Sequence, residues 1–87
     1  MRDNVEAGRF EQEIDGLLVF ANYRRAQGVL SILHVEAAPP LRGAGAASRL
    51  MGEIAALARA EGLRIRPLCG YASAWLRRSA AHRDLVA

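Results

Sequence analysis

The stretch PPLRGAGAASRL, Pro39 to Leu50, decides the fold. Its two prolines end the strand that precedes them, because proline has no N–H to donate to a sheet ladder. Arg42, Gly43 and Gly45 follow within four residues of one another. From Ala46 onward the apolar side chains are spaced as on one face of a helix. The stretch therefore predicts the end of a strand, a glycine-rich turn and the start of a helix.

The residues before this stretch predict an antiparallel meander of three strands. Arg9–Asp15 reads as an edge strand, Leu17–Arg25 as the returning strand and Val29–Ala37 as a third strand rich in β-branched residues. Asp15-Gly16 is a hairpin signal, and Ala26–Gly28 supplies a second turn. Residues 1–8 carry no such pattern, and we expect them to be frayed.

After the glycine-rich turn, the chain alternates between helical and extended patterns. A helix is predicted over Ala44–Glu61, with Gly62 in the position of a C-terminal glycine. Leu63–Cys69 predicts a short strand, Tyr71–Arg78 a shorter helix and His82–Val86 a terminal turn. The order β-β-β-α-β-α predicts an α+β domain over residues 1–87, with a mostly antiparallel sheet and two helices. The crossover through the long helix allows its two flanking strands to run parallel.

Composition narrows the class of protein further. The chain is 52% hydrophobic and 24% charged, and its net charge of +3 comes with twelve arginines and no lysine. No apolar run is long enough for a membrane span. The polar N-terminus and the lone Cys69 favour a cytoplasmic protein without a disulfide. The scattered positive charge gives weak support for nucleic-acid binding, so that partner is not expected.

The glycine-rich turn has the ingredients of a diphosphate site. The first N–H groups of a helix lack partners within it and form the positive end of its dipole, where an anion binds if no side chain obstructs it. Gly43 and Gly45 leave the approach open, and Arg42 adds a cation. The Lys-Ser/Thr pair of a P-loop and the third glycine of a dinucleotide fingerprint are both absent. Alternatively, the glycines form only a tight turn beside a solvated arginine.

At this point the sequence resembles a known family. LRGAGAASRL resembles the Arg/Gln-x-x-Gly-x-Gly/Ala motif of the GNAT acetyltransferase superfamily, and HVEAAPPLRGAGAASRLM, ARAEGLRIRPLCGYASAWLRR and DLV are similar to its small single-domain subgroup. The resemblance runs from Phe10 to Val86. It implies a minimal GNAT fold in which acetyl-CoA, as substrate, lies between two splayed strands. By the same resemblance, the residues at its pyrophosphate are Arg42, Gly43, Ala44, Gly45, Ala46 and Ala47.

The sequence departs from the family pattern in three places. Ala44 stands where members often carry Gln or Arg between the glycines. His34-Val35-Glu36 replaces a His-Thr-Glu run. Ser79 opens the segment where many members have His-Pro-Glu, so a histidine role at that place is not carried over.

Two candidate catalytic residues lie around the second helix. In the subgroup, a cysteine in the context of Cys69 is suggested as an acyl acceptor, and a thiol near a helix N-terminus ionises more readily. The alternative is a small buried hydrophobic side chain. Tyr71 is either a general acid for the departing thiolate, as in many GNAT enzymes, or a packing residue.

The third strand carries the other candidates. His34 and Glu36 fall on one face of that strand and could deprotonate an amine, with either as the base. The alternative is a structural histidine beside the coenzyme arm. The resemblance implies that strand amides hold the pantetheine and that an N–H near Val35, Glu36 or Ala37 stabilises the oxyanion.

These residues lead to one preferred function and two alternatives. We expect an acetyl-CoA-binding N-acetyltransferase that moves an acetyl group to an unidentified small-molecule or peptide amine, directly or through Cys69. The first alternative is a non-catalytic coenzyme A-binding sensor or partner subunit, and the second is a small nucleic-acid-binding protein. We expect a monomer or weak homodimer, no membrane partner and no metal.

Overall fold

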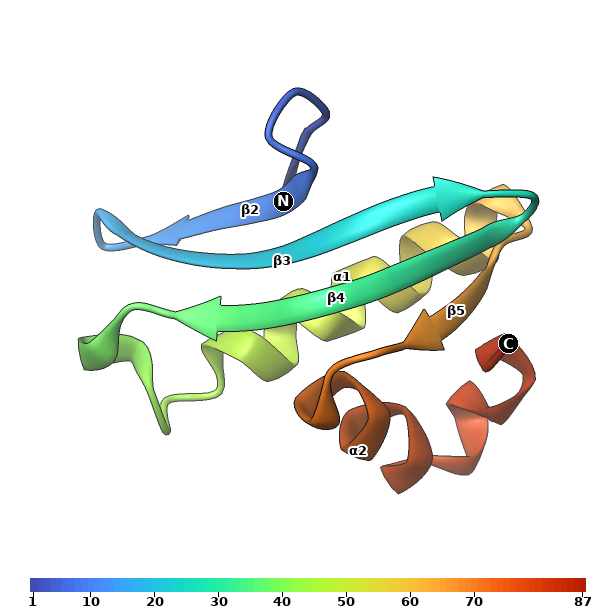
Figure 1. The fold of residues 1–87 in the computed structure, drawn as a ribbon. Helices are drawn as coiled ribbons and strands as arrows, with labels where there is room; N and C mark the ends of the chain where they lie inside the picture. The colour runs from blue at the N-terminus through green and yellow to red at the C-terminus, as the bar shows by residue number, and fades with distance from the viewer.

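In a computed structural model that describes all 87 residues, five strands form one sheet and a long helix packs across one face of it (Figure 1). The strands lie in sequence order, β1-β2-β3-β4-β5, and all neighbours are antiparallel except β4 and β5. The strands are β1 (Arg2–Asn4), β2 (Arg9–Ile14), β3 (Leu17–Ala26), β4 (Val29–Ala37) and β5 (Arg64–Pro67). The α+β prediction and the parallel pairing across the crossover are confirmed.

Two tight turns fix the register of the meander. Asp15-Gly16 and Gln27-Gly28 both have positive φ at each residue, which is the backbone of a type I′ hairpin turn. Because a two-residue turn sets which residues face each other, β2–β3 and β3–β4 are aligned with their apolar residues on a common face.

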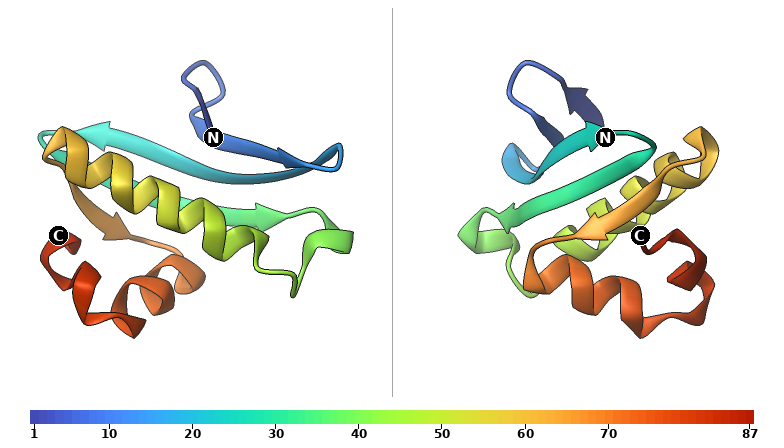
Figure 2. Two further views of the ribbon diagram at one scale, coloured as in Figure 1. Left: turned by 180° about the vertical axis from the view of Figure 1, so that it is seen from behind. Right: turned by 45° about the vertical axis from the view of Figure 1, so that its right-hand side comes forward.

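Helix α1 (Ala46–Glu61) covers that apolar face, as the view from behind shows (Figure 2). It ends at Gly62, which is left-handed with φ 69° and donates to the carbonyls of Ala58 and Arg59. Apart from Ala46 at its start, its buried side chains share the face toward the sheet: Leu50, Met51, Ile54, Ala55 and Ala58. They pack against buried residues of the strands: Phe10, Val19, Ala21, Leu30, Ile32 and Ile65.

Strands β4 and β5 separate near their carboxyl ends. They pair only from Val29 to Ile32, and Leu68 N donates to Ile32 O at 2.9 Å before the chain turns away. Strand β4 continues to Ala37, so its last residues have no neighbour on that side. A bulge lies at the same place, since Asn22 faces His34 while the next residue, Tyr23, faces Ile32.

The remaining helices are short, and two of them lie beside β5. The 3₁₀ helix η1 (Pro39–Leu41) follows β4, while α2 (Gly70–Arg78) and the 3₁₀ helix η2 (Ala80–Leu85) follow β5. Val86 then bridges back to Ile65 in the parallel sense. No helix in the structure combines the length and the hydropathy that crossing a bilayer requires.

The N-terminus differs from the prediction of a frayed segment. Residues Arg2–Asn4 form β1 and pair with Arg9–Glu11, so β2 lies at the sheet edge only beyond that point. Polar contacts hold β1 in place, and a pattern of hydrophobic residues in the sequence cannot reveal such contacts. Asp3 accepts from the Tyr23 hydroxyl and, at 3.0 Å, from Arg25.

Candidate functional site

A cleft of about 510 Å³ lies where β4 ends and α1 begins. One wall is the open edge of β4, the floor is the loop that follows η1, and Tyr71 of α2 closes one side. The residues that line it are His34, Val35, Glu36, Ala37, Leu41, Arg42, Gly43, Gly45, Ala46, Ala47, Ser48 and Tyr71. Of the site residues predicted from the sequence, all but Ala44 and Cys69 therefore line one cleft.

Main-chain N–H groups without hydrogen-bond partners gather on the floor of the cleft. They belong to Gly43, Gly45, Ala46, Ala47 and Ser48. The first partnered amide of the helix is that of Arg49, which donates to Gly45 O at 3.0 Å. The amides at the start of α1 sit at the positive end of a 16-residue helix with no acidic side chain in its first turn, so this is a favourable place for an anion.

The two glycines are required by backbone conformation and not by crowding. Gly43 and Gly45 have φ values of 79° and 82°, in the left-handed region that L side chains rarely adopt. A Cβ at either position would meet no protein atom within 4 Å. Ala44, between them, uses its amide to bond Leu41 O at 3.2 Å and does not line the cleft, so the structure offers no contact from it.

Arg42 ties the loop back to the strand. Its Nε donates to Ala37 O at 3.2 Å, and its terminal nitrogens have no partner. The side chain is exposed at the rim of the cleft. The bond through Nε restricts the guanidinium, which leaves the rest of its donors free for an anion beside the amides.

The open edge of β4 presents peptide groups to the cleft. Ala38 N donates to Leu18 O at 2.9 Å on the β3 side. Because antiparallel strands alternate between residues that bond the neighbour and residues that do not, the peptide groups of Val35 and Ala37 point away from β3. On that side β5 has already ended, so the N–H groups of Val35 and Ala37 and the Val35 carbonyl are available to an extended ligand, whereas the Ala37 carbonyl accepts from Arg42.

His34 and Glu36 form a pair on the opposite side of the strand from the core. His34 Nε2 lies 3.0 Å from Glu36 Oε1, and both side chains are about half exposed, at 55% and 50%. The Phe20 ring lies edge-on to His34 with centroids 6.3 Å apart. The pair is therefore reachable from solvent, and its carboxylate orients one ring nitrogen of the imidazole.

A hydrogen bond between helices fixes the side wall. Trp75 Nε1 of α2 donates to Ser48 Oγ in the first turn of α1 at 2.9 Å. The Trp75 ring also stacks on His82, with centroids 4.5 Å apart. Tyr71, one turn earlier in α2, is exposed, lines the cleft and has no partner for its hydroxyl. Trp75 therefore positions the helix that carries Tyr71.

Cys69 has a structural contact that sequence reasoning did not anticipate. It is the N-cap residue of α2, and its Sγ accepts from Ala72 N at 3.3 Å. The side chain is partly buried, packs against the core and does not line the cleft. The thiol is thus placed at a helix N-terminus as expected, but engaged in capping it.

Sequence reasoning missed two residues of the cleft, Leu41 and Ser48. Leu41 is buried beneath the loop, and η1 turns it inward. Ser48 could have been found, because it occupies the first turn of a helix whose amides were already singled out. Its partnership with Trp75 joins residues 27 apart in the chain and has no local signal.

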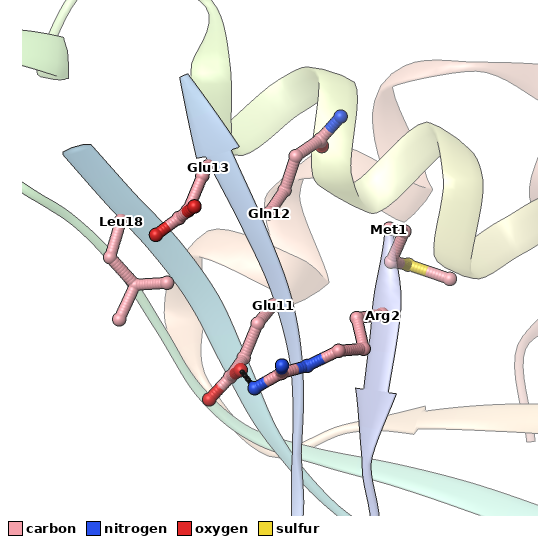
Figure 3. Close-up of a pocket in the computed structure, with 6 residues that line it drawn as sticks. All are labelled: Met1, Arg2, Glu11, Gln12, Glu13 and Leu18. Carbon is pink, nitrogen blue, oxygen red and sulfur yellow. Dashed lines mark hydrogen bonds and ion pairs between the residues drawn. The ribbon is translucent and has the colours of Figure 1, made fainter. Parts of the chain in front are cut away.

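A second hollow, of about 430 Å³, lies beside the start of β1 (Figure 3). Its charges are already bound to one another: the Glu11 carboxylate accepts from Arg2 at 2.6 Å, from Asn4 at 3.1 Å and from Arg9. Chiefly through Arg9, these donors lower the pKa of Glu11 from 4.5 to about 2. These contacts therefore tie β1 to the sheet, and the residues around this hollow have no set of free donors comparable to that of the cleft. Its lining residues are Met1, Arg2, Glu11, Gln12, Glu13 and Leu18.

Comparison with known proteins gives one finding that bears on this cleft. A family model described as GCN5-related N-acetyl-transferase matches residues 9–85. No curated protein matches the chain significantly. The matched range contains the whole cleft and all strands except β1.

Proposed function

Since the chain belongs to the GCN5-related N-acetyl-transferase family, whose members generally use acetyl-CoA, we propose that it transfers an acetyl group from acetyl-CoA to a primary amine. The observation that carries the proposal is the set of unpartnered amides at Gly43 and Gly45–Ser48. They are of the kind that holds a diphosphate, and Arg42 lies beside them.

The rest of the substrate follows from the geometry of β4. The pantetheine arm contains amides, and the outward N–H groups of Val35 and Ala37 and the Val35 carbonyl can bond these as a neighbouring strand would. The arm then occupies the gap that β5 leaves beyond Pro67. A main-chain N–H in this stretch stabilises the negative charge that develops on the acetyl oxygen.

Proton transfer is assigned to the pair on β4. The acceptor must lose a proton before its nitrogen can attack, and neutral His34 takes it while Glu36 stabilises the imidazolium. The amine nitrogen then forms a bond to the acetyl carbon, the carbon–sulfur bond breaks, and the thiolate receives a proton from the Tyr71 hydroxyl. The tyrosinate takes the remaining extra proton of the attacking nitrogen, so that the amide and coenzyme A leave and His34 returns its proton to solvent. The free hydroxyl of Tyr71 at the cleft supports this role.

Transfer through Cys69 receives less support from the geometry, since its Sγ is engaged with Ala72 N and lies outside the cleft lining. Direct attack by the amine is therefore the proposed route. The cysteine route predicts a covalent gain of one acetyl group after incubation with acetyl-CoA, which intact mass spectrometry detects. Such a gain that disappears in Cys69→Ser would replace direct transfer by the cysteine route.

The first experiment measures melting temperature with coenzyme A and with acetyl-CoA, followed by a screen of primary amines for acetylation. Both ligands are expected to raise the melting temperature by mass action. Turnover is expected to fall in His34→Gln without loss of that stabilisation. Stabilisation with no turnover on any amine would indicate a coenzyme A-binding module. If neither ligand changes the melting temperature, the proposal is wrong.

A further inference from the structure

One face of the sheet carries no helix. Helix α1 packs on the other face, and α2 is bonded to α1 through Trp75, so the face toward the viewer in Figure 1 is open across β3, β4 and the start of β5. Alternation along β4 assigns its residues to the two faces: Leu30 and Ile32 are buried beneath α1, whereas Ser31 between them points to the open face.

Three arginines project from this face around Ser31. Arg24 of β3 and Arg66 of β5 both lie opposite Ser31 in the register, and Arg64 lies opposite Val29. Residues opposite one another in neighbouring strands point to the same side, so the three guanidinium groups share one surface. The β3 and β5 backbones lie about 10 Å apart, two strand spacings. We call Arg24, Arg64 and Arg66 the arginine cluster.

The arginine cluster has no internal counter-charge. All three side chains are exposed, and none makes a hydrogen bond or an ion pair. Elsewhere on the sheet, arginines are paired: Arg25 with Asp3 and Glu61, and Arg9 with Glu11. Like charges gathered on one face of the sheet, at two positions of β5 and on β3 two strands away, repel one another, and an anionic ligand relieves this repulsion.

The arginine cluster continues into the candidate site along one strand. Beyond the bulge, His34 and Glu36 also point to the open face, in the direction of the cleft. Strand residues advance about 3.3 Å each, so Ser31 and Glu36 are about 16 Å apart along β4. One surface therefore carries a carboxylate and a base at one end and three cations at the other.

We propose that the arginine cluster binds the carboxylates of an acidic protein segment whose amine, held beside His34 and Glu36, receives the acetyl group. The proposal rests on the proposed function and defines its substrate class: an extended peptide with acidic side chains about three to five residues from the reacting amine. The cationic amine fits the end with Glu36, and the acidic side chains fit the arginines.

A peptide fits this surface better than a nucleic acid does. Single-stranded nucleic acids bind on exposed aromatic rings as well as on cations. The one aromatic ring of β3 on the open face, Phe20, is already covered by the Arg9 guanidinium, 4.7 Å from its centroid. An acetyl acceptor also needs a nucleophilic amine, which lysine side chains and peptide N-termini supply.

The test measures binding of a fluorescent peptide by anisotropy, without coenzyme. The probe has one lysine and a run of glutamates three to five residues away, and its control has glutamines in place of the glutamates. The acidic peptide is expected to bind more tightly, and Arg24→Gln and Arg66→Gln are each expected to weaken it by about twofold to fivefold. Arg83→Gln, an exposed arginine without a partner on η2, is the matched control and should leave binding unchanged.

Charge reversal gives the sharper result. The double variant Arg24→Glu, Arg66→Glu is expected to prefer a peptide with lysines in place of the glutamates, while acetyl-CoA stabilises it as it does the original protein. Equal binding of the acidic and glutamine peptides, or no effect of the variants, would overturn the proposal. So would an oligothymidylate that displaces the peptide with higher affinity. Peptide binding that persists in a protein unaffected by acetyl-CoA would overturn the proposed function alone.

Discussion

Replacing Gly45 by alanine tests two properties of this residue separately: its left-handed backbone and its place in the cleft. Gly45 has φ 82° and ψ 8°, and it precedes the first residue of α1. Gly62, at the other end of the same helix, has φ 69° and ψ 26°. A Cβ at either glycine would meet nothing within 4 Å, so the two substitutions impose the same kind of backbone strain.

The cost of that strain can be worked out for both variants. A non-glycine residue in the left-handed region costs about 1–2 kcal/mol. For a chain of this size each kcal/mol lowers the melting temperature by about 4–8 °C. Gly45→Ala and Gly62→Ala should therefore each melt at least about 4 °C below the original protein.

Binding of coenzyme A should distinguish the variants. Gly45 lines the cleft and contributes an unpartnered amide, whereas Gly62 lies at the far end of a helix about 24 Å long. Alanine keeps the N–H of residue 45, but its Cβ occupies open space at the cleft and obstructs the approach of an anion to the amides. Loss of one hydrogen bond to a charged phosphate through this obstruction costs about 1.5–3 kcal/mol, which is a factor of about ten or more in affinity. Isothermal titration with coenzyme A, well below either melting temperature, is expected to show this loss in Gly45→Ala only.

Two results would contradict the reasoning. Equal affinity loss in both variants would mean that binding follows stability and that the diphosphate lies elsewhere. An unchanged melting temperature for Gly45→Ala would mean that residue 45 is not left-handed in solution.

Two further changes test how the cleft and the sheet edge are held. Trp75→Phe removes the donor to Ser48 Oγ, a hydrogen bond expected to contribute about 1 kcal/mol. The variant should therefore melt about 4–8 °C below the original protein in differential scanning fluorimetry. Tyr71→Phe, which loses no hydrogen bond, is the control. Glu11 has a pKa lowered from 4.5 to about 2 in the folded chain, so its stabilisation is complete above pH 4.5 and is lost as the pH falls toward 2. Urea unfolding should show that Glu11→Gln is less stable than the original protein at pH 7 and loses less stability between pH 4.5 and pH 2; parallel curves would remove Glu11 as a source of acid sensitivity.

Much of the fold could be predicted from local sequence signals. Asp15-Gly16 fixed the first hairpin, Val29–Ala37 was predicted with the bounds of β4, and α1 differs from its prediction by two residues at its start. These elements have strong periodicity and explicit stop residues, so neighbours in the sequence determine them. The residues predicted around the glycine-rich turn also lie together, since that turn and the end of β4 are only a few residues apart.

The remaining features depend on contacts between distant residues. Strand β1 forms because Glu11, Asp3 and Tyr23 hold it, and none of these pairings has a periodic signature. The arginine cluster joins β3 to β5, whose residues are about 40 apart in the chain, and becomes visible only once the register is known. Likewise, Cys69 was recognised by its place before a helix, but its capping bond depends on a side-chain rotamer.

The bulge in β4 explains why one strand can serve the core, the cleft and the open face. Before it, Leu30 and Ile32 point beneath α1; after it, Ala37 does, because Leu33 is the extra residue. If the bulge were absent and all residues alternated strictly from Ile32, His34 would turn into the core, where burying an imidazole without hydrogen-bond partners is unfavourable. The change of alternation at the bulge thus places the proposed base on the same face as the arginine cluster. The bulge also keeps the apolar side chains of the strand against α1, so His34 is exposed without any loss of packing in the core.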